Sequence, residues 1–293
     1  MLSQKPWNVD AVVRLLLGVI VCLCLGSVAG SMLHYAGPGG TERVIFVAVA
    51  AAAGVLLALA VILVSRPWTI ENIARRLLLL LTCLSAGMAF AAWGQKIAGK
   101  PPEGSFGEQM VVAETAVLLL LIGFMRAQRL SWSESFGLPT RPRQAILSGI
   151  AVACIFLPVA EGLQWASTQA MTQVRMEPQE QQAVHALRVS STWSNRLVLA
   201  LLALLLAPLL EEIFFRGILY PAIKQAGFPR LALWGVSLAF ACVHFNVATF
   251  IPLLVLAIIL TALYERTDNL LAPISAHALF NGLNFTRLYL LGQ

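Results

Sequence analysis

Charged residues are scarce in this chain of 293 residues: Asp, Glu, Lys and Arg make up 12% of it, and 59% of the residues are hydrophobic. An average soluble domain has about 25% charged residues. A water-soluble fold of this size cannot bury so much apolar surface, which excludes a soluble globular enzyme. The same hydrophobicity excludes an intrinsically disordered chain. The composition therefore predicts a membrane protein with several spans.

Cysteine is also rare, and its positions exclude a cysteine-based metal protein and a disulfide-stabilised protein. All five cysteines lie inside apolar stretches, with neither metal-site spacing nor the pattern of a disulfide framework; they are Cys22, Cys24, Cys83, Cys154 and Cys242.

The net charge is +6, but the basic residues lie mostly in short loops between apolar segments. This distribution is typical of the cytoplasmic side of membrane proteins, so we expect no nucleic-acid partner.

Long apolar runs are what the sequence has instead. They occur near residues 11–33, 44–64, 77–94, 110–127, 145–166, 196–220, 231–246, 249–264 and 271–291. A helical span needs roughly 17–25 apolar residues, so the runs predict an all-α bundle of eight or nine transmembrane helices. With the N-terminus in the cytoplasm, most Lys and Arg residues fall on the cytoplasmic side, and we expect a multipass protein of a bacterial inner membrane.

Charged side chains interrupt one of these runs. Glu211, Glu212 and Arg216 lie within the apolar segment 204–220. Each such charge costs about 2.5–3.5 kcal/mol at the centre of a membrane helix, so partners or a function are needed. Glu212 and Arg216 are four residues apart on one helix face and can neutralise each other. Glu211 points about 100° away, which leaves its carboxylate for another purpose.

Two histidines lie in later apolar runs, and each has a same-face neighbour four residues away. Phe240 precedes His244 in one run, and His277 precedes Asn281 in another. Glu211 is 13 residues before Lys224 and His244 is 14 residues after Arg230, which places both at about 20 Å from the same loop. The spacing therefore predicts that Glu211 and His244 lie at one depth, as a joint site requires.

The three patterns together resemble the CPBP family of intramembrane proteases, which includes type II CAAX prenyl endopeptidases and bacteriocin self-immunity proteins. Glu211-Glu212 with Arg216, Phe240 with His244, and His277 with Asn281 follow in the family's order, and the similarity covers roughly residues 195–285. The resemblance implies that Glu211 is the catalytic base and that His244 helps to activate the water. It assigns oxyanion stabilisation to His277 and Asn281, and support to Glu212 and Arg216. Residues 141–293 then form the protease core, and residues 1–140 form N-terminal helices without a family motif.

A second assignment of the same residues uses a metal. Glu211, His244 and His277 are an acceptable set of three ligands for a catalytic zinc with water in the fourth position. The resemblance is compatible with a metalloprotease and with a metal-free glutamate mechanism, and we favour the latter. Peptide hydrolysis in either form needs an activated water and a donor for the developing oxyanion.

Two other functions use the same features. Glutamates and histidines in spans also occur in proton-coupled transporters, although the sequence shows no internal repeat. A non-catalytic immunity or partner-binding membrane protein is the other alternative. The leading hypothesis remains a multipass endopeptidase whose substrate is a peptide or a membrane-protein segment within the lipid bilayer. The sequence predicts neither the substrate's identity nor the oligomeric state.

Overall fold

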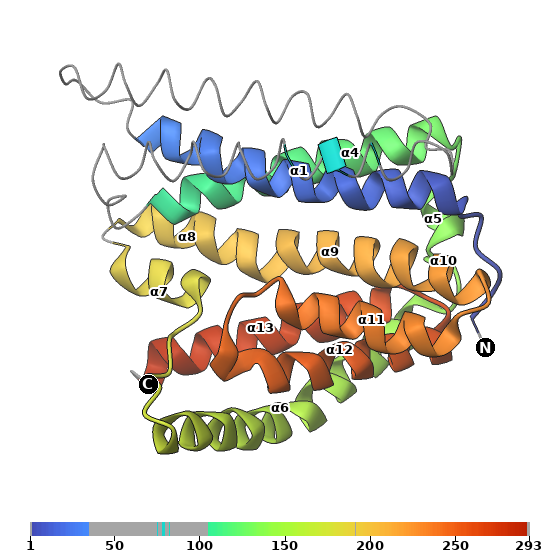
Figure 1. Cartoon of the computed structure of the whole chain (residues 1–293). Helices are drawn as coiled ribbons and strands as arrows, with labels where there is room; N and C mark the ends of the chain where they lie inside the picture. The colour runs from blue at the N-terminus through green and yellow to red at the C-terminus, as the bar shows by residue number, and fades with distance from the viewer. Residues whose placement is uncertain are drawn as a thin grey trace, which may run out of the picture. The chain divides into compact units, whose positions relative to one another are not determined.

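The computed structural model describes residues 2–34, 75, 78, 79, 82, 105–190 and 192–291. Its elements are α1 (Val9–His34), α4 (Ser105–Ala127), α5 (Trp132–Ser135), α6 (Pro142–Gln173), α7 (Gln182–Val189), α8 (Trp193–Leu201), η1 (Leu202–Leu206), α9 (Ala207–Glu211), η2 (Glu212–Leu219), α10 (Tyr220–Gln225), α11 (Pro229–Cys242), α12 (Val247–Thr267) and α13 (Leu271–Leu291). These described residues contain helices and no strand, which confirms the all-α class (Figure 1).

Four helices of the described part are long and apolar enough to cross a membrane. They are Phe106–Ala127, Pro142–Gln173, Trp193–Gln225 and Val247–Thr267. The apolar helix Pro229–Cys242 is shorter. The predicted count of eight or nine spans is not confirmed, and the predicted runs 44–64 and 77–94 lie outside the described residues except for positions 78, 79 and 82.

The chain divides into two compact units. The first comprises Met1–Val9, Gln128–Arg188 and Ala200–Gln293, and the second comprises Asp10–Ala127 and Val189–Leu199. Every candidate site residue belongs to the first unit. The predicted division between residues 1–140 and 141–293 stays a prediction.

Helices α6 and α13 pack against each other within the first unit. A Cβ atom on Gly149 of α6 would lie 2.1 Å from Ser275 Oγ and 2.4 Å from the Ala272 carbonyl oxygen of α13. Only a residue without a side chain permits this approach. The crossing therefore sets the position of α13, which carries His277 and Asn281.

The helix that carries the two glutamates is wider than an α-helix over two stretches. Residues of η1 and η2 form π-helical turns, and each stretch precedes a proline, Pro208 in α9 and Pro221 in α10. A proline donates no backbone hydrogen bond, and its ring collides with the carbonyl four residues earlier. A wider turn relieves that collision, and such turns are frequent at functional sites.

The start of α13 is fixed by the turn that joins it to α12. The Asn269 side chain is fully buried, and its amide nitrogen donates to the carbonyl oxygens of Thr140 at 2.7 Å and Leu138 at 3.3 Å. Its Oδ1 atom accepts from the backbone nitrogen of Leu271 at 2.9 Å, at the first residue of α13. Lys5 Nζ holds the preceding residue, Asp268, at 2.9 Å.

Candidate active site

Glu212 and Arg216 form a completely buried ion pair on η2. Both side chains have 0% exposure, and Arg216 Nη1 donates to Glu212 Oε1 at 2.7 Å. Arg216 Nη2 also donates to the carbonyl oxygen of Ala257 on α12, at 3.3 Å. The pairing expected from the four-residue spacing is therefore present. Since each charge has a partner, the pair avoids the large cost of an isolated buried ion.

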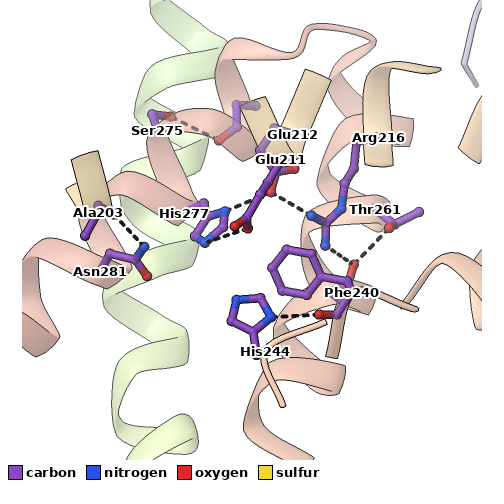
Figure 2. A network of polar contacts seen from close by, with 12 residues as sticks. Ala203, Glu211, Glu212, Arg216, Phe240, His244, Thr261, Ser275, His277 and Asn281 are labelled. Atoms are coloured by element: carbon purple, nitrogen blue, oxygen red, sulfur yellow. Dashed lines mark hydrogen bonds and ion pairs between the residues drawn. The ribbon is translucent and has the colours of Figure 1, made fainter. Parts of the chain in front are cut away.

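His277 joins the same carboxylate from α13. Its Nδ1 atom lies 2.9 Å from Glu212 Oε1, and the side chain is almost completely buried. A carboxylate only accepts hydrogen bonds, so Nδ1 of His277 carries a proton and donates it. The other ring nitrogen, Nε2, is thereby turned toward Glu211 (Figure 2).

Glu211 is the glutamate that takes no part in this ion pair. Its Oε2 atom lies 3.9 Å from His277 Nε2, which is longer than a hydrogen bond. The same oxygen is buried and has no hydrogen-bond partner among the described residues. The side chain as a whole is 29% exposed. Glu211 thus combines an unused acceptor with partial access to its surroundings.

Phe240 connects His244 to the ion pair of Glu212 and Arg216. Its ring is fully buried, and the guanidinium carbon of Arg216 lies 4.3 Å from the ring centroid, which is a cation–π contact. The ring centroids of His244 and His277 lie 4.9 and 5.6 Å from that of Phe240. The aromatic ring therefore brings both imidazoles to one place (Figure 2).

His244 follows the last turn of α11 and is half-buried. Its Nδ1 atom lies 2.7 Å from the carbonyl oxygen of Phe240, four residues earlier. Since a carbonyl oxygen accepts, Nδ1 donates and fixes the ring orientation. Nε2 is then the ring nitrogen that remains for a water molecule or a substrate.

Asn281 lies one turn beyond His277 on α13. Its amide nitrogen donates to the carbonyl oxygen of Ala203 in η1 at 3.0 Å. The amide has a second N–H and an oxygen that this bond does not use. Asn281 is thus fixed by the backbone of η1 while it keeps donor capacity.

The assignment of Glu211, His244 and His277 as zinc ligands stays a prediction. No group of three or more His, Cys, Asp or Glu side chains is arranged to hold a metal ion in the part of the chain that the structure describes. Glu211 and His277 face each other, and the bonds from Nδ1 of His277 to Glu212 and from Nδ1 of His244 to a backbone carbonyl leave Nε2 of both rings available. Because no three-ligand group is arranged for a metal among the described residues, we derive no step through a metal.

The sequence did not predict the partners on α12. Ala257 supplies a carbonyl oxygen that accepts from Arg216 and also from the hydroxyl of Thr261, at 2.8 Å. A backbone carbonyl carries no residue-type signal, so no motif points to it. The stacking of Phe240 on Arg216 is equally invisible to spacing, because the two residues lie on different helices.

Buried charges within long apolar helices define an integral membrane protein with a buried polar site in one of its two units. Residues 193–283 match the family model described as Type II CAAX prenyl endopeptidase Rce1-like. The chain therefore carries an Rce1-like domain, and the resemblance seen in the motifs is confirmed. This domain is that of a family of CAAX-type membrane proteases.

A curated protein is similar over part of the chain. A stretch of 83 residues is 34% identical to the uncharacterized protein YpbD of Bacillus subtilis (strain 168). The match covers 27% of this chain and 40% of YpbD, so the chain spans less than half the length of that relative. No solved structure matches the chain.

Proposed function

We propose that the chain is a multipass intramembrane endopeptidase that hydrolyses peptide bonds with a water molecule activated by Glu211. The observation that carries the proposal is the difference between the two adjacent glutamates. Oε2 is buried without a hydrogen bond in both glutamates, but Glu212 Oε1 accepts from Arg216 and His277, whereas Glu211 only faces His277 Nε2, at 3.9 Å. A carboxylate in an apolar helix whose oxygens accept no hydrogen bond from the described residues is suited to accept a proton.

The first step is attack of water on the scissile carbonyl. Glu211 accepts a proton from the water as the new C–O bond forms. Nε2 of His244 holds the same water, because Nδ1 of that ring is committed to the Phe240 carbonyl. Two acceptors aimed at one water orient its lone pair toward the substrate.

The oxyanion that results is stabilised from α13. His277 donates from Nε2 when both ring nitrogens carry a proton, because the Nδ1–H is already donated to Glu212. Asn281 adds the N–H that its bond to Ala203 leaves free. Donors fixed before the reaction stabilise such a charge without reorganisation.

The second step breaks the C–N bond. Glu211 transfers the proton taken from water to the leaving amine, so the carboxylate is regenerated and one water is consumed for each bond cleaved. Glu212 and Arg216 take no part in bond making. They hold His277 and keep the buried site from carrying an excess negative charge.

The proposal also covers the membrane in which the chain lies and the partners that it binds. We place the chain in a bacterial inner membrane with its N-terminus in the cytoplasm, and its partners are a peptide or membrane-protein segment and the lipid bilayer, with no nucleic acid. The word prenyl in the description of the matching family makes a prenylated peptide the first substrate to try.

The test uses the full chain purified into lipid nanodiscs. A set of apolar peptides, each with a fluorophore and a quencher at opposite ends and made with and without a prenyl group, is incubated with the protein, and cleavage positions are read by mass spectrometry. Glu211→Gln keeps the shape of the side chain and should reduce cleavage by about 10²–10⁴-fold, as expected for loss of a general base. Glu177→Gln, in an exposed loop, is the matched control and should cleave like the wild type.

Three outcomes contradict the proposal. One is equal cleavage by Glu211→Gln and the wild type. Another is proton-coupled uptake by vesicles that contain the wild type but show no cleavage. The third is loss of cleavage after dialysis against a zinc chelator with recovery on adding zinc, which would replace the metal-free mechanism.

A further inference from the structure

Asn284 is a polar residue of α13 that the proposed mechanism does not use. Each of the other described polar side chains of this helix has a partner: Ser275 donates to Ala272, His277 to Glu212, Asn281 to Ala203, Thr286 to Gly282, and Arg287 pairs with Glu161. No hydrogen bond reaches Asn284 from any residue that the structure describes. Its side chain is half-buried.

Asn284 lies on the same face of α13 as the site residues His277 and Asn281. At about 100° per residue, Asn281 lies about 40° to one side of His277 and Asn284 about 20° to the other. The three side chains therefore share one face of the helix, within an arc of about 60°. His277 and Asn281 bind Glu212 of η2 and Ala203 of η1, so this face is directed at the helix that carries Glu211. Thr286 lies about 180° from His277, on the opposite face.

No described residue uses the half-buried amide of Asn284, which is therefore able to bind a ligand. Helix α13 packs against α6 and α12, which are both long and apolar enough to cross a membrane. A carboxamide has donors and an acceptor, which are the groups that a peptide backbone needs.

We propose that Asn284 binds the backbone of the peptide substrate about three residues away from the scissile bond. Seven residues separate it from His277, which corresponds to about 10.5 Å along the helix axis. An extended peptide advances about 3.3 Å per residue, so the same length spans about three substrate residues. Asn284 is a positioning residue in this scheme, because it touches the substrate but not the reacting atoms. The inference rests on the proposed endopeptidase function.

The test measures kinetics and binding in the same nanodiscs. Asn284→Leu keeps the size of the side chain and removes its hydrogen bonds, and Thr286→Val is the matched control on the opposite face. With the best-cleaved quenched peptide we expect Asn284→Leu to raise KM by about 3–10-fold, the value of one hydrogen bond, with kcat unchanged within about twofold. Thr286→Val should leave both constants unchanged.

A series of N-methylated peptides locates the contact. Each member lacks one backbone N–H, and methylation at the third residue on one side of the scissile bond should raise KM for the wild type. The same methylation should have no additional effect in Asn284→Leu, because both changes remove one interaction. A structural role for Asn284 predicts additive effects at every position and would overturn the inference.

Binding without turnover separates this inference from the function on which it rests. A dye-labelled peptide is titrated into Glu211→Gln and into the double variant with Asn284→Leu, and fluorescence anisotropy gives Kd. A Kd that is weaker by about 3–10-fold in the double variant supports the contact even where no cleavage occurs. Equal Kd values, no binding to either protein, or a change of oligomeric mass in Asn284→Leu would each overturn it.

Discussion

The Nδ1 atom of His277 lies 2.9 Å from the Oε1 atom of Glu212, and that oxygen also accepts from Arg216 at 2.7 Å. One carboxylate oxygen thus joins a histidine of α13 to an arginine of η2. Any change that removes the arginine also disturbs the histidine. Loss of stability and loss of activity can therefore be separated only by comparing a change at Arg216 alone with a combined change at Glu212 and Arg216.

Arg216→Met should destabilise the protein strongly. The substitution leaves the Glu212 carboxylate fully buried without its main cation, and breaking a buried ion pair in this way costs about 3–5 kcal/mol. Thermal unfolding in nanodiscs measures the loss. Glu212→Leu combined with Arg216→Met should recover most of the stability, since no unpaired charge remains, yet cleavage should stay low because His277 has lost its Nδ1 acceptor. A double variant as unstable as Arg216→Met would contradict the ion-pair argument.

His277→Gln should lower kcat and leave KM nearly unchanged. Removing one oxyanion donor typically costs about 10²–10³-fold in kcat, because the contact is made only as negative charge develops. Steady-state kinetics with the quenched peptide separates the two constants. Ser275→Ala, on the face of α13 toward α6, is the control for general damage to the helix and should retain activity. A rise in KM without a fall in kcat would show that His277 binds substrate instead.

Gly149→Ala should destabilise the chain by about 1–3 kcal/mol, the usual cost of overpacking. The new methyl group would meet the backbone carbonyl of Ala272 at 2.4 Å, and a backbone cannot turn aside as a side chain can. The shift of α13 should also reduce cleavage. Gly162→Ala is a matched control on the same helix, because nothing lies within 4 Å of its added carbon. Gly162→Ala should be neutral or stabilising by up to about 1 kcal/mol. A lower Tm for Gly162→Ala than for Gly149→Ala would show that α6 and α13 are not in the close contact described.

The contribution of Asp268 to stability should disappear in acid. Burial raises the pKa of Asp268, but the hydrogen bonds from Lys5 and Ser3 outweigh burial and leave the pKa below its ordinary value. A carboxyl group whose pKa is lowered by folding stabilises the folded state above its unfolded pKa, and loses this effect as pH falls through the folded pKa. Lys5→Met should therefore lower Tm by about 2–4 °C at pH 7, the shift expected for roughly 1 kcal/mol. The difference in Tm between the two proteins should shrink below about pH 4, and a difference that grows in acid would show that Lys5 acts in another way.

The fold class followed from composition, but the number of spans did not. Hydropathy alone predicts where a helix is apolar, and α12 at Val247–Thr267 agrees with the run at 249–264. The run at 231–246 corresponds to α11, which ends at Cys242 and is shorter than a span. Such an ending depends on the turn that follows, where Asn246 caps α12 by accepting from the Thr249 nitrogen at 3.0 Å. A smoothed hydropathy pattern does not resolve that local bond.

The residues of the site were more predictable than their contacts. The four-residue spacing of Glu212 and Arg216 suffices to pair them, because it is a property of one helix. The bonds from His277 to Glu212 and from Asn281 to Ala203 join distant parts of the chain, and spacing says nothing about them. Helical angles also fail across η1 and η2, since a π turn holds more residues than the α-helix assumed in the sequence analysis.

The widened turns of η1 have a consequence for protein engineering. This stretch contains Ala203, which anchors Asn281, and precedes Glu211, so it sets how far the carboxylate is rotated relative to α13. Deleting one residue from Leu202–Leu206 would favour an ordinary α turn and rotate everything before it by about 100° relative to everything after it. Such a deletion should therefore turn the Glu211 carboxylate away from His277.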